Sequence, residues 1–287
     1  MKKKDSMLWC FRIISPVLFY LIFSQIMAVA LMGIFSVVFA AVARDGRNPM
    51  DMAYEYYMGH LLLVTVIMSA AVLPFFSYFY KRDRKLYGGL HARQGEKIPA
   101  RQYGYVALAG VGLCVAANTI LSWSNLGQIF DGYEEVAKSL YRNNLVFELL
   151  AMGLLIPLTE ELLFRGLCFQ RMRERMAFLP SALLSSLLFG VYHGNVMQGV
   201  YAGILGFGMC WVYEKYRSFA APYVFHAAAN IASVLITETV LGRPFHSMAG
   251  SIAAVAVGLA VLLFAIYRIH NIRRYRGETT FGRNPML

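Results

Sequence analysis

Six strongly polar side chains lie deep inside long apolar stretches of the sequence, where an ionised group costs roughly 3 kcal/mol even on a lenient insertion scale. They are Glu160, Glu161, Arg165, His193, His226 and Asn230. An apolar cavity favours the protonated form of a glutamate, which suits it to take a proton from water. Histidine and asparagine can donate hydrogen bonds to the oxyanion that forms when water adds to a peptide carbonyl. These residue types indicate a hydrolase site.

Spacing separates catalytic from supporting candidates. Glu161 and Arg165 are four residues apart on one helical face, so an ion pair between them can offset part of the cost of burying the arginine. Glu160 is rotated by about 100° from Glu161 and remains free to point elsewhere, where it could deprotonate a water held beside His193. The predicted catalytic residues are Glu160, His193, His226 and Asn230, and the predicted structural supports are Glu161 and Arg165.

Each residue also has a structural interpretation. A lone membrane histidine such as His226 is usually an interhelical hydrogen-bond partner, and Asn230 alone is more often a packing residue. Phe189, one turn before His193, fits packing as well as function. Glu160 is harder to explain in this way, because few roles other than chemistry or proton transport keep a glutamate at mid-depth.

The elements that must position these residues are membrane-spanning helices. With 287 residues, 58% of them hydrophobic and only 15% charged, the chain is too apolar for a soluble domain of its length. We predict an all-α, multi-pass integral membrane protein with about eight transmembrane helices. The apolar stretches lie at 14–43, 60–80, 102–123, 145–170, 180–194, 197–213, 219–240 and 249–268.

The basic residues predict the orientation. Most of the 27 Lys and Arg residues fall in loops on one side of these stretches, which places both the N- and the C-terminus in the cytoplasm. The net charge of +11 is therefore mainly a topology signal, with attraction to anionic lipid as a by-product. Nucleic acid is not expected as a partner, since no basic and aromatic surface lies outside the loops.

The chain divides into three predicted parts. Residues 1–144 hold three N-terminal helices with a basic cytoplasmic loop, residues 145–240 hold the four helices of a catalytic core, and residues 241–287 hold the last helix and a basic cytoplasmic tail. All six candidate residues belong to the core.

Depth in the membrane gives an independent test of the catalytic candidates. If the helix that carries Glu160 meets the cytoplasmic surface near Arg171, Glu160 lies about 16 Å inside, at a rise of about 1.5 Å per residue. The same reckoning puts His193 roughly 20 Å deep, and His226 and Asn230 roughly 10 and 16 Å deep. All four fall in one layer of a hydrocarbon core that is about 30 Å thick, which predicts a shared site.

Three motifs follow one another along these helices: EExxxR at 160–165, FxxxH at 189–193 and HxxxN at 226–230. Together they resemble the CPBP intramembrane proteases, the family of CAAX proteases and bacteriocin-processing enzymes also called Abi. The resemblance covers about residues 145–235. It implies an endopeptidase with a mostly helical fold, whose eukaryotic relatives trim prenylated CAAX proteins.

By motif position, the resemblance implies that Glu160 and His193 activate the water, that His226 and Asn230 form the oxyanion hole, and that the EExxxR glutamate–arginine pair braces the site. The family was long described as metal-dependent, and Glu160, His193 and His226 also match a catalytic zinc set. No HExxH motif is present, and an asparagine suits an oxyanion hole better than a metal shell. We favour a mechanism without a cofactor and keep zinc as the alternative.

The expected partners are the lipid bilayer and a peptide or membrane-protein substrate, with or without a prenyl group. A site at mid-depth requires a substrate segment that reaches about 10–20 Å into the bilayer, so a lipidated or apolar peptide is expected. Two other functions stay open: a proton-coupled transporter with Glu160 as the carrier, and a non-catalytic bacteriocin-immunity protein. The key residues all lie in the second half of the chain, which favours a local catalytic site over a transporter built from two related halves.

Overall fold

The computed structural model describes residues 3–42, 46–87, 98–124, 133–141 and 143–271. These residues form helices and contain no strand, which confirms the all-α fold class. The helices outside the centre of the chain are α1 (Lys3–Val42), α2 (Pro49–Gly59), α3 (Leu61–Tyr87), α4 (Ala100–Ser122), α6 (Tyr133–Leu140), α10 (Phe178–Tyr192), α11 (Val196–Tyr216), α12 (Ala220–Glu238), the 3-10 helix η4 (Val240–His246) and α13 (Met248–His270).

Within the described residues, six helices are long and apolar enough to cross a membrane, namely α1 from Asp5, α3, α4, α11, α12 and α13. The apolar helix α10 is shorter, and the predicted stretch 145–170 is helical but segmented. All eight predicted apolar stretches are therefore helical, and the chain is a multi-pass membrane protein. The count of eight spans and the cytoplasmic termini remain predictions. Part of the charge pattern behind them, in 88–97 and 272–287, lies outside the described residues.

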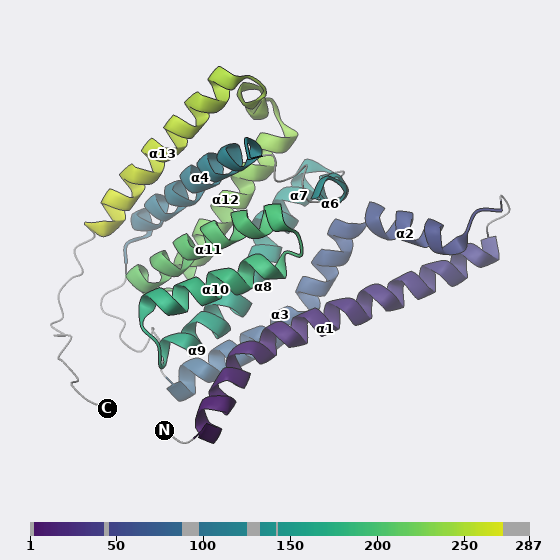
Figure 1. The fold of residues 1–287 in the computed structure, drawn as a ribbon, viewed down its shortest axis with the longest axis horizontal. Helices are drawn as coiled ribbons and strands as arrows, with labels where there is room; N and C mark the ends of the chain where they lie inside the picture. Colours follow the sequence, from purple (N-terminus) through teal and green to yellow (C-terminus); the bar gives the residue numbers. More distant parts are fainter. Residues whose placement is uncertain (1–2, 43–45, 88–97, 125–132, 142, 272–287) are drawn as a thin grey trace.

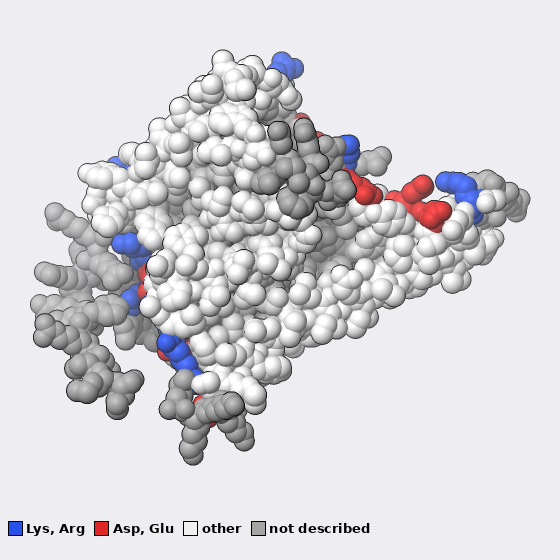
Figure 2. All heavy atoms as spheres, viewed as in Figure 1, with Lys and Arg blue, Asp and Glu red and all other residues white. Residues whose placement is uncertain are grey.

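The charged side chains are distributed as a membrane protein requires. Figure 2 shows one face of the molecule, on which a broad middle region carries neither Lys and Arg nor Asp and Glu, while the coloured charged side chains lie at its edges. Large apolar side chains are exposed on the helices, for example Ile22 and Val29 on α1 and Leu187 on α10. An apolar surface of this extent needs a nonpolar solvent, and the bilayer supplies it.

The centre of the chain forms one continuous helical path of five segments. They are α7 (Leu145–Leu150), the π-helix η2 (Ala151–Leu155), α8 (Ile156–Glu161), the π-helix η3 (Leu162–Phe169) and α9 (Gln170–Arg173). Pro157 explains the first π-helical stretch, because proline has no N–H to donate to the carbonyl of Gly153 and its ring crowds that carbonyl. The two glutamates thus lie at the end of a six-residue α-helix between two wider turns.

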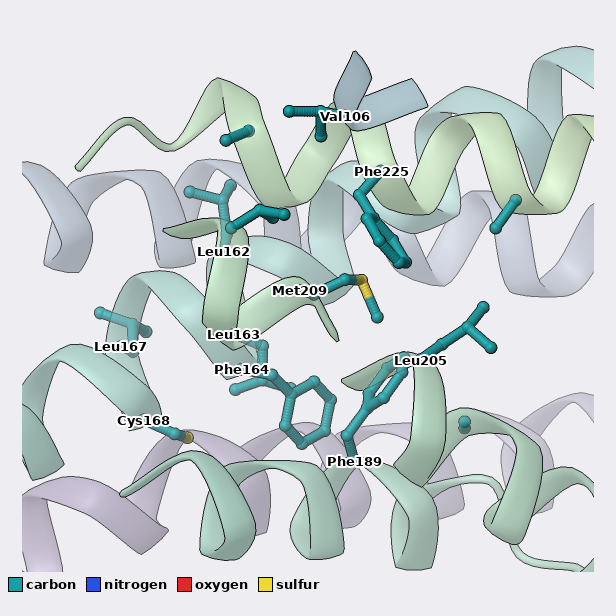
Figure 3. Close-up of a cluster of buried hydrophobic side chains, with 14 of the residues drawn as sticks. Val106, Leu162, Leu163, Phe164, Leu167, Cys168, Phe189, Leu205, Met209 and Phe225 are labelled. Atoms are coloured by element: carbon teal, nitrogen blue, oxygen red, sulfur yellow. The ribbon is translucent and has the colours of Figure 1, made fainter. Parts of the chain in front are cut away.

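The segmented helix is buried at the centre of the bundle. From Leu162 to Phe169 every residue is buried, and η3 contacts α1, α3, α10 and α11. Figure 3 shows the apolar core around it, where the rings of Phe164 and Phe189 lie side by side with their centroids 5.0 Å apart. On the far side of the core, α4 packs against both α12 and α13 (Figure 1). The candidate residues are therefore held by helices that are themselves packed on several sides.

Candidate active site

The candidate site begins with a buried ion pair on the segmented helix. Glu161 Oε1 lies 2.9 Å from Arg165 Nη1, and both side chains are 0% exposed. The helical spacing predicted this contact. Gly206 on α11 makes room for the guanidinium, because a Cβ at that position would lie 2.9 Å from Arg165 Nη2.

His226 connects this ion pair to Glu160. Its Nδ1 lies 2.9 Å from Glu161 Oε1, and its Nε2 lies 3.6 Å from Glu160 Oε2. A carboxylate can only accept a hydrogen bond, so Nδ1–H of His226 donates to Glu161. One imidazole on α12 therefore bridges the two adjacent glutamates of α8, and its Nε2 faces Glu160.

His193 lies at the turn between α10 and α11. Gly194, with a φ of 75°, forms the turn, and Asn195 caps α11 by accepting a hydrogen bond of 2.8 Å from the main-chain N–H of Gln198. His193 Nδ1 lies 2.8 Å from the carbonyl oxygen of Phe189. A carbonyl oxygen accepts, so Nδ1 carries the proton and Nε2 of the neutral ring is free to accept another.

Phe189 packs against three of the candidate residues. Its ring is 1% exposed and meets the rings of His193 and His226 edge to face, with centroid distances of 4.8 and 5.6 Å. The guanidinium of Arg165 lies 4.3 Å from the centroid of the same ring. Phe189 therefore fixes both imidazoles and the arginine at once.

Asn230 is positioned by the π-helical stretch η2. Its Nδ2 donates a hydrogen bond of 2.9 Å to the main-chain carbonyl oxygen of Met152. The amide has a second N–H and an oxygen, and the residue lies one helical turn beyond His226 on α12. The wider backbone turn before Glu160 thus also orients Asn230.

All four predicted catalytic side chains line one cavity of about 420 Å³. Glu160 contributes from α8, His193 from the end of α10, and His226 and Asn230 from α12. The remaining walls come from α1, α3, α4, α6 and α11, and are formed mostly by apolar, amide and hydroxyl side chains. Glu161 and Arg165 lie behind this surface. The arrangement presents a carboxylate, two imidazoles and an amide to a space that can hold a water and a peptide bond.

The zinc alternative needs Glu160, His193 and His226 to converge on one ion. Across the described ranges, no three His, Cys, Asp or Glu side chains are grouped as metal ligands. Glu160 and His226 face each other, and the contact of His193 Nδ1 with the carbonyl of Phe189 leaves Nε2 of His193 as the nitrogen that could bind a metal ion. The metal-free mechanism stays a prediction with zinc as its alternative, and no step proposed below uses a metal ion.

Two features of the site were not predicted from the sequence. The contact between His226 and Glu161 joins residues 65 positions apart, and helical spacing says nothing about which side chains meet across two helices. The sequence indicated a packing role for Phe189 as strongly as a functional role. Its place as the first residue of the FxxxH motif, one turn before His193, was the available signal, and in the structure that turn brings its carbonyl oxygen to the imidazole.

Comparison with known proteins finds a family match over the segment that carries the candidate residues. Residues 142–232, which contain all six candidate residues, match the family model described as type II CAAX prenyl endopeptidase Rce1-like. YxdF of Lactococcus lactis subsp. lactis, strain IL1403, a UPF0177 protein, is 32% identical over 81 residues, or 28% of this chain and 44% of YxdF. YdiL of Bacillus subtilis, strain 168, whose name describes a candidate membrane peptidase, is 26% identical over 80 residues, or 28% of this chain and 33% of YdiL.

The similarity to these relatives is local. The chain spans less than half the length of each curated relative that it matches. No solved structure matches the chain. The family model and the region that the three motifs define coincide closely, since the model covers 142–232 and the motifs run from Glu160 to Asn230. Over its central segment, residues 142–232, the chain is therefore similar to the Rce1-like type II CAAX prenyl endopeptidases.

Proposed function

We propose that this protein is an intramembrane endopeptidase that hydrolyses a peptide bond of an apolar or lipidated peptide or membrane protein. The observation that carries the proposal is the shared cavity: Glu160, His193, His226 and Asn230 come from three helices and line the same space of about 420 Å³. The match to the Rce1-like family model supports a CAAX-type protease in general.

In the proposed reaction, Glu160 and His193 hold the attacking water. Glu160 is 8% exposed and borders the cavity, so its carboxylate can take a proton from that water as the water oxygen adds to the peptide carbonyl. His193 can accept a hydrogen bond from the same water through Nε2, because its Nδ1–H is held by the carbonyl of Phe189. The proton on Glu160 then passes to the leaving amine.

The developing oxyanion is assigned to His226 and Asn230. Asn230 has one amide N–H on the carbonyl of Met152 and a second N–H available for the oxyanion. His226 donates from Nδ1 to Glu161, so it can donate to the oxyanion only when Nε2 also carries a proton. The Glu161 carboxylate, 2.9 Å from Nδ1, compensates the charge of that doubly protonated form.

Glu161 and Arg165 are assigned a supporting role. Both are fully buried and neither borders the cavity. Glu161 orients His226 through Nδ1, and Arg165 keeps Glu161 in place. This is the arrangement in which an acidic residue orients a reacting histidine without itself touching substrate.

The test compares wild type with Glu160→Gln, purified in detergent, on a panel of prenylated CAAX peptides and apolar leader peptides, with products read by mass spectrometry. Glu148→Gln is the matched control, because Glu148 lies on the same segmented helix, is 0% exposed and does not line the cavity. Loss of a general base typically lowers the rate by about 10²–10⁴-fold. We expect that loss for Glu160→Gln and little change for Glu148→Gln. Full activity in folded Glu160→Gln would contradict the general-base assignment.

A further inference from the structure

The first turns of α1 are fastened to the cytoplasmic end of the segmented helix. Pro16 has no N–H to donate to the carbonyl oxygen of Arg12, four residues earlier, and that oxygen accepts a hydrogen bond from Nη1 of Arg171 instead. The guanidinium of Arg12 bonds both carboxylate oxygens of Glu174, at 3.1 and 3.2 Å. Nε1 of Trp9 donates to the main-chain carbonyl of Arg171, at 2.9 Å. The start of α1 is therefore held at the depth of Arg171.

The outer part of α1 leaves the interior of the bundle. Tyr20 is buried, but none of the residues of α1 in the range 21–42 is. The ring contacts of this outer part are made with α2, where Phe35 and Phe39 lie 4.9 and 5.8 Å from Tyr56. Figure 1 shows it diverging from the central helices together with α2. The packing of α1 against the apolar core thus ends at Tyr20.

The cavity begins where this packing ends. Its lining residues on α1 are Tyr20, Leu21, Ser24 and Gln25. By helix rise, Tyr20 and Gln25 lie about 12 and 20 Å beyond Arg12, while Glu160 lies about 16 Å from Arg171. The two scales have a common origin, because Arg171 is bonded to the carbonyl of Arg12. This part of α1 therefore passes the site at the depth of Glu160.

The two sides of α1 differ at this depth. Toward α3 the helix is covered, because the rings of Phe19 and Phe75 stack with their centroids 4.4 Å apart. Another face carries a mostly apolar stripe, spaced by three and four residues, of exposed side chains: Leu18, Leu21, Ile22 and Gln25. Leu21 and Gln25 also line the cavity. The exposed α1 stripe is therefore continuous with the cavity wall.

The end of α10 borders the same part of the cavity. Tyr192 lines it beside His193, and the centroid of the Tyr192 ring lies 5.4 Å from that of Tyr20. Val191, the residue before Tyr192, is exposed and lies about 16 Å from Pro180 by helix rise. Apolar surface that faces the bilayer thus reaches the pair of tyrosines from both helices, at the depth of the catalytic candidates.

We propose that the substrate enters the cavity sideways from the bilayer, between α1 and α10, and that the contact of Tyr20 with Tyr192 is the point it must pass. An apolar or lipidated segment of the substrate then occupies the exposed α1 stripe. This inference rests on the proposed peptidase function and adds a route for its substrate. Such a segment can stay in lipid until the cleaved bond reaches Glu160, and it does not have to cross the ion pairs at the cytoplasmic end of α1.

The first experiment measures which surface the substrate contacts before cleavage. The photoreactive residue p-benzoylphenylalanine replaces Ile22 in Glu160→Gln or, as the control, Val257 of α13. Ile22 is 59% and Val257 63% exposed, neither lines the cavity, and by helix rise they lie about 15 Å from Arg12 and about 16 Å from Arg268. Each protein is placed in phospholipid nanodiscs with a labelled peptide that wild type cleaves there.

We expect about fivefold more peptide adduct at Ile22 than at Val257, and we expect unlabelled peptide to reduce the adduct only at Ile22. Equal adducts at both positions would show that the stripe meets only peptide dissolved in the lipid, and would overturn the proposed route. The peptidase function would stand, because wild type cleaves the same peptide in the same nanodiscs. Cleavage of no peptide by wild type would overturn both proposals.

The second experiment narrows the entrance. Leu21→Trp places a large ring on the stripe at the edge of the cavity. Ile26→Trp is the control, because Ile26 lies on the same helix, is 61% exposed and does not line the cavity. We expect kcat/KM for the peptide in nanodiscs to fall about tenfold in Leu21→Trp and to change less than about twofold in Ile26→Trp, with Tm near that of wild type in both. Unchanged kcat/KM in Leu21→Trp would contradict entry along this side of α1.

Discussion

Replacing Arg165 with methionine isolates the contribution of the buried ion pair. In wild type both partners are 0% exposed, and Glu161 Oε1 is bonded by Arg165 Nη1 and His226 Nδ1, each at 2.9 Å. Removing one partner of a buried pair costs about 3–5 kcal/mol, because the other charge is left uncompensated. The guanidinium also lies 4.3 Å from the ring centroid of Phe189, a contact worth about 1–2 kcal/mol when desolvated.

We therefore expect Arg165→Met to lose about 4 kcal/mol of stability. By the scaling for soluble domains, this lowers Tm by roughly 10 °C, which thermal unfolding in detergent can resolve. The double variant Glu161→Gln with Arg165→Met removes the stranded charge and should recover much of the lost Tm. Its peptidase activity should remain low, because Nδ1 of His226 no longer has a charged partner to orient the ring. A wild-type Tm for Arg165→Met, or a double variant less stable than the single one, would refute the ion-pair reasoning.

The remaining predictions concern neighbouring groups. Gly206→Ala should lower stability by about 1–3 kcal/mol through overpacking, because the new Cβ would lie 2.9 Å from Arg165 Nη2. Gly203→Ala is the control, because a Cβ at Gly203 meets only one carbonyl oxygen, at 3.7 Å. Equal Tm values for the two variants would contradict the packing argument. Asn230→Leu should lower kcat by about 10²-fold with a smaller change in KM, as expected for a lost oxyanion donor; an unchanged kcat would remove Asn230 from that role. Peptidase activity should survive dialysis against a strong chelator, and a loss that added zinc restores would show that the metal-free mechanism is wrong.

Much of the fold was predictable because membrane helices leave a strong signal in the sequence. Backbone groups in lipid must bond within their own segment, so each long apolar stretch had to be helical. The short helix α10 ends at Tyr192, and α11 begins at Val196. The turn predicted around Gly194 is present, and a glycine suits it because φ is positive there.

The π-helical turns could not be predicted from the periodicity of the sequence. A helical wheel assumes 3.6 residues per turn throughout, and it treated 145–170 as uniform. Pro157 lay within that stretch and could have indicated a local break, because proline removes one backbone hydrogen bond. The consequence for the site is specific: the carbonyl of Met152 in η2 accepts the hydrogen bond that orients Asn230.

The shared cavity of the four catalytic candidates was predictable, because helix rise alone gave them similar expected depths. Which side chains touch was not, because that depends on how α8, α10 and α12 are rotated against one another. The spacing of Glu161 and Arg165 lies within one helix, and that contact is present as predicted. The contacts of His226 with both glutamates cross between helices, and only the packed structure supplies them.

The paired glutamates are explained by this bridge. Neighbouring residues on a helix point about 100° apart, so Glu160 and Glu161 cannot both face the cavity. An imidazole has two ring nitrogens on different sides, and His226 places Nδ1 on Glu161 and Nε2 toward Glu160. One carboxylate can then orient the histidine while the other remains at the cavity surface for water. The different roles proposed for Glu160 and Glu161 therefore follow from helix geometry and from the shape of the His226 side chain.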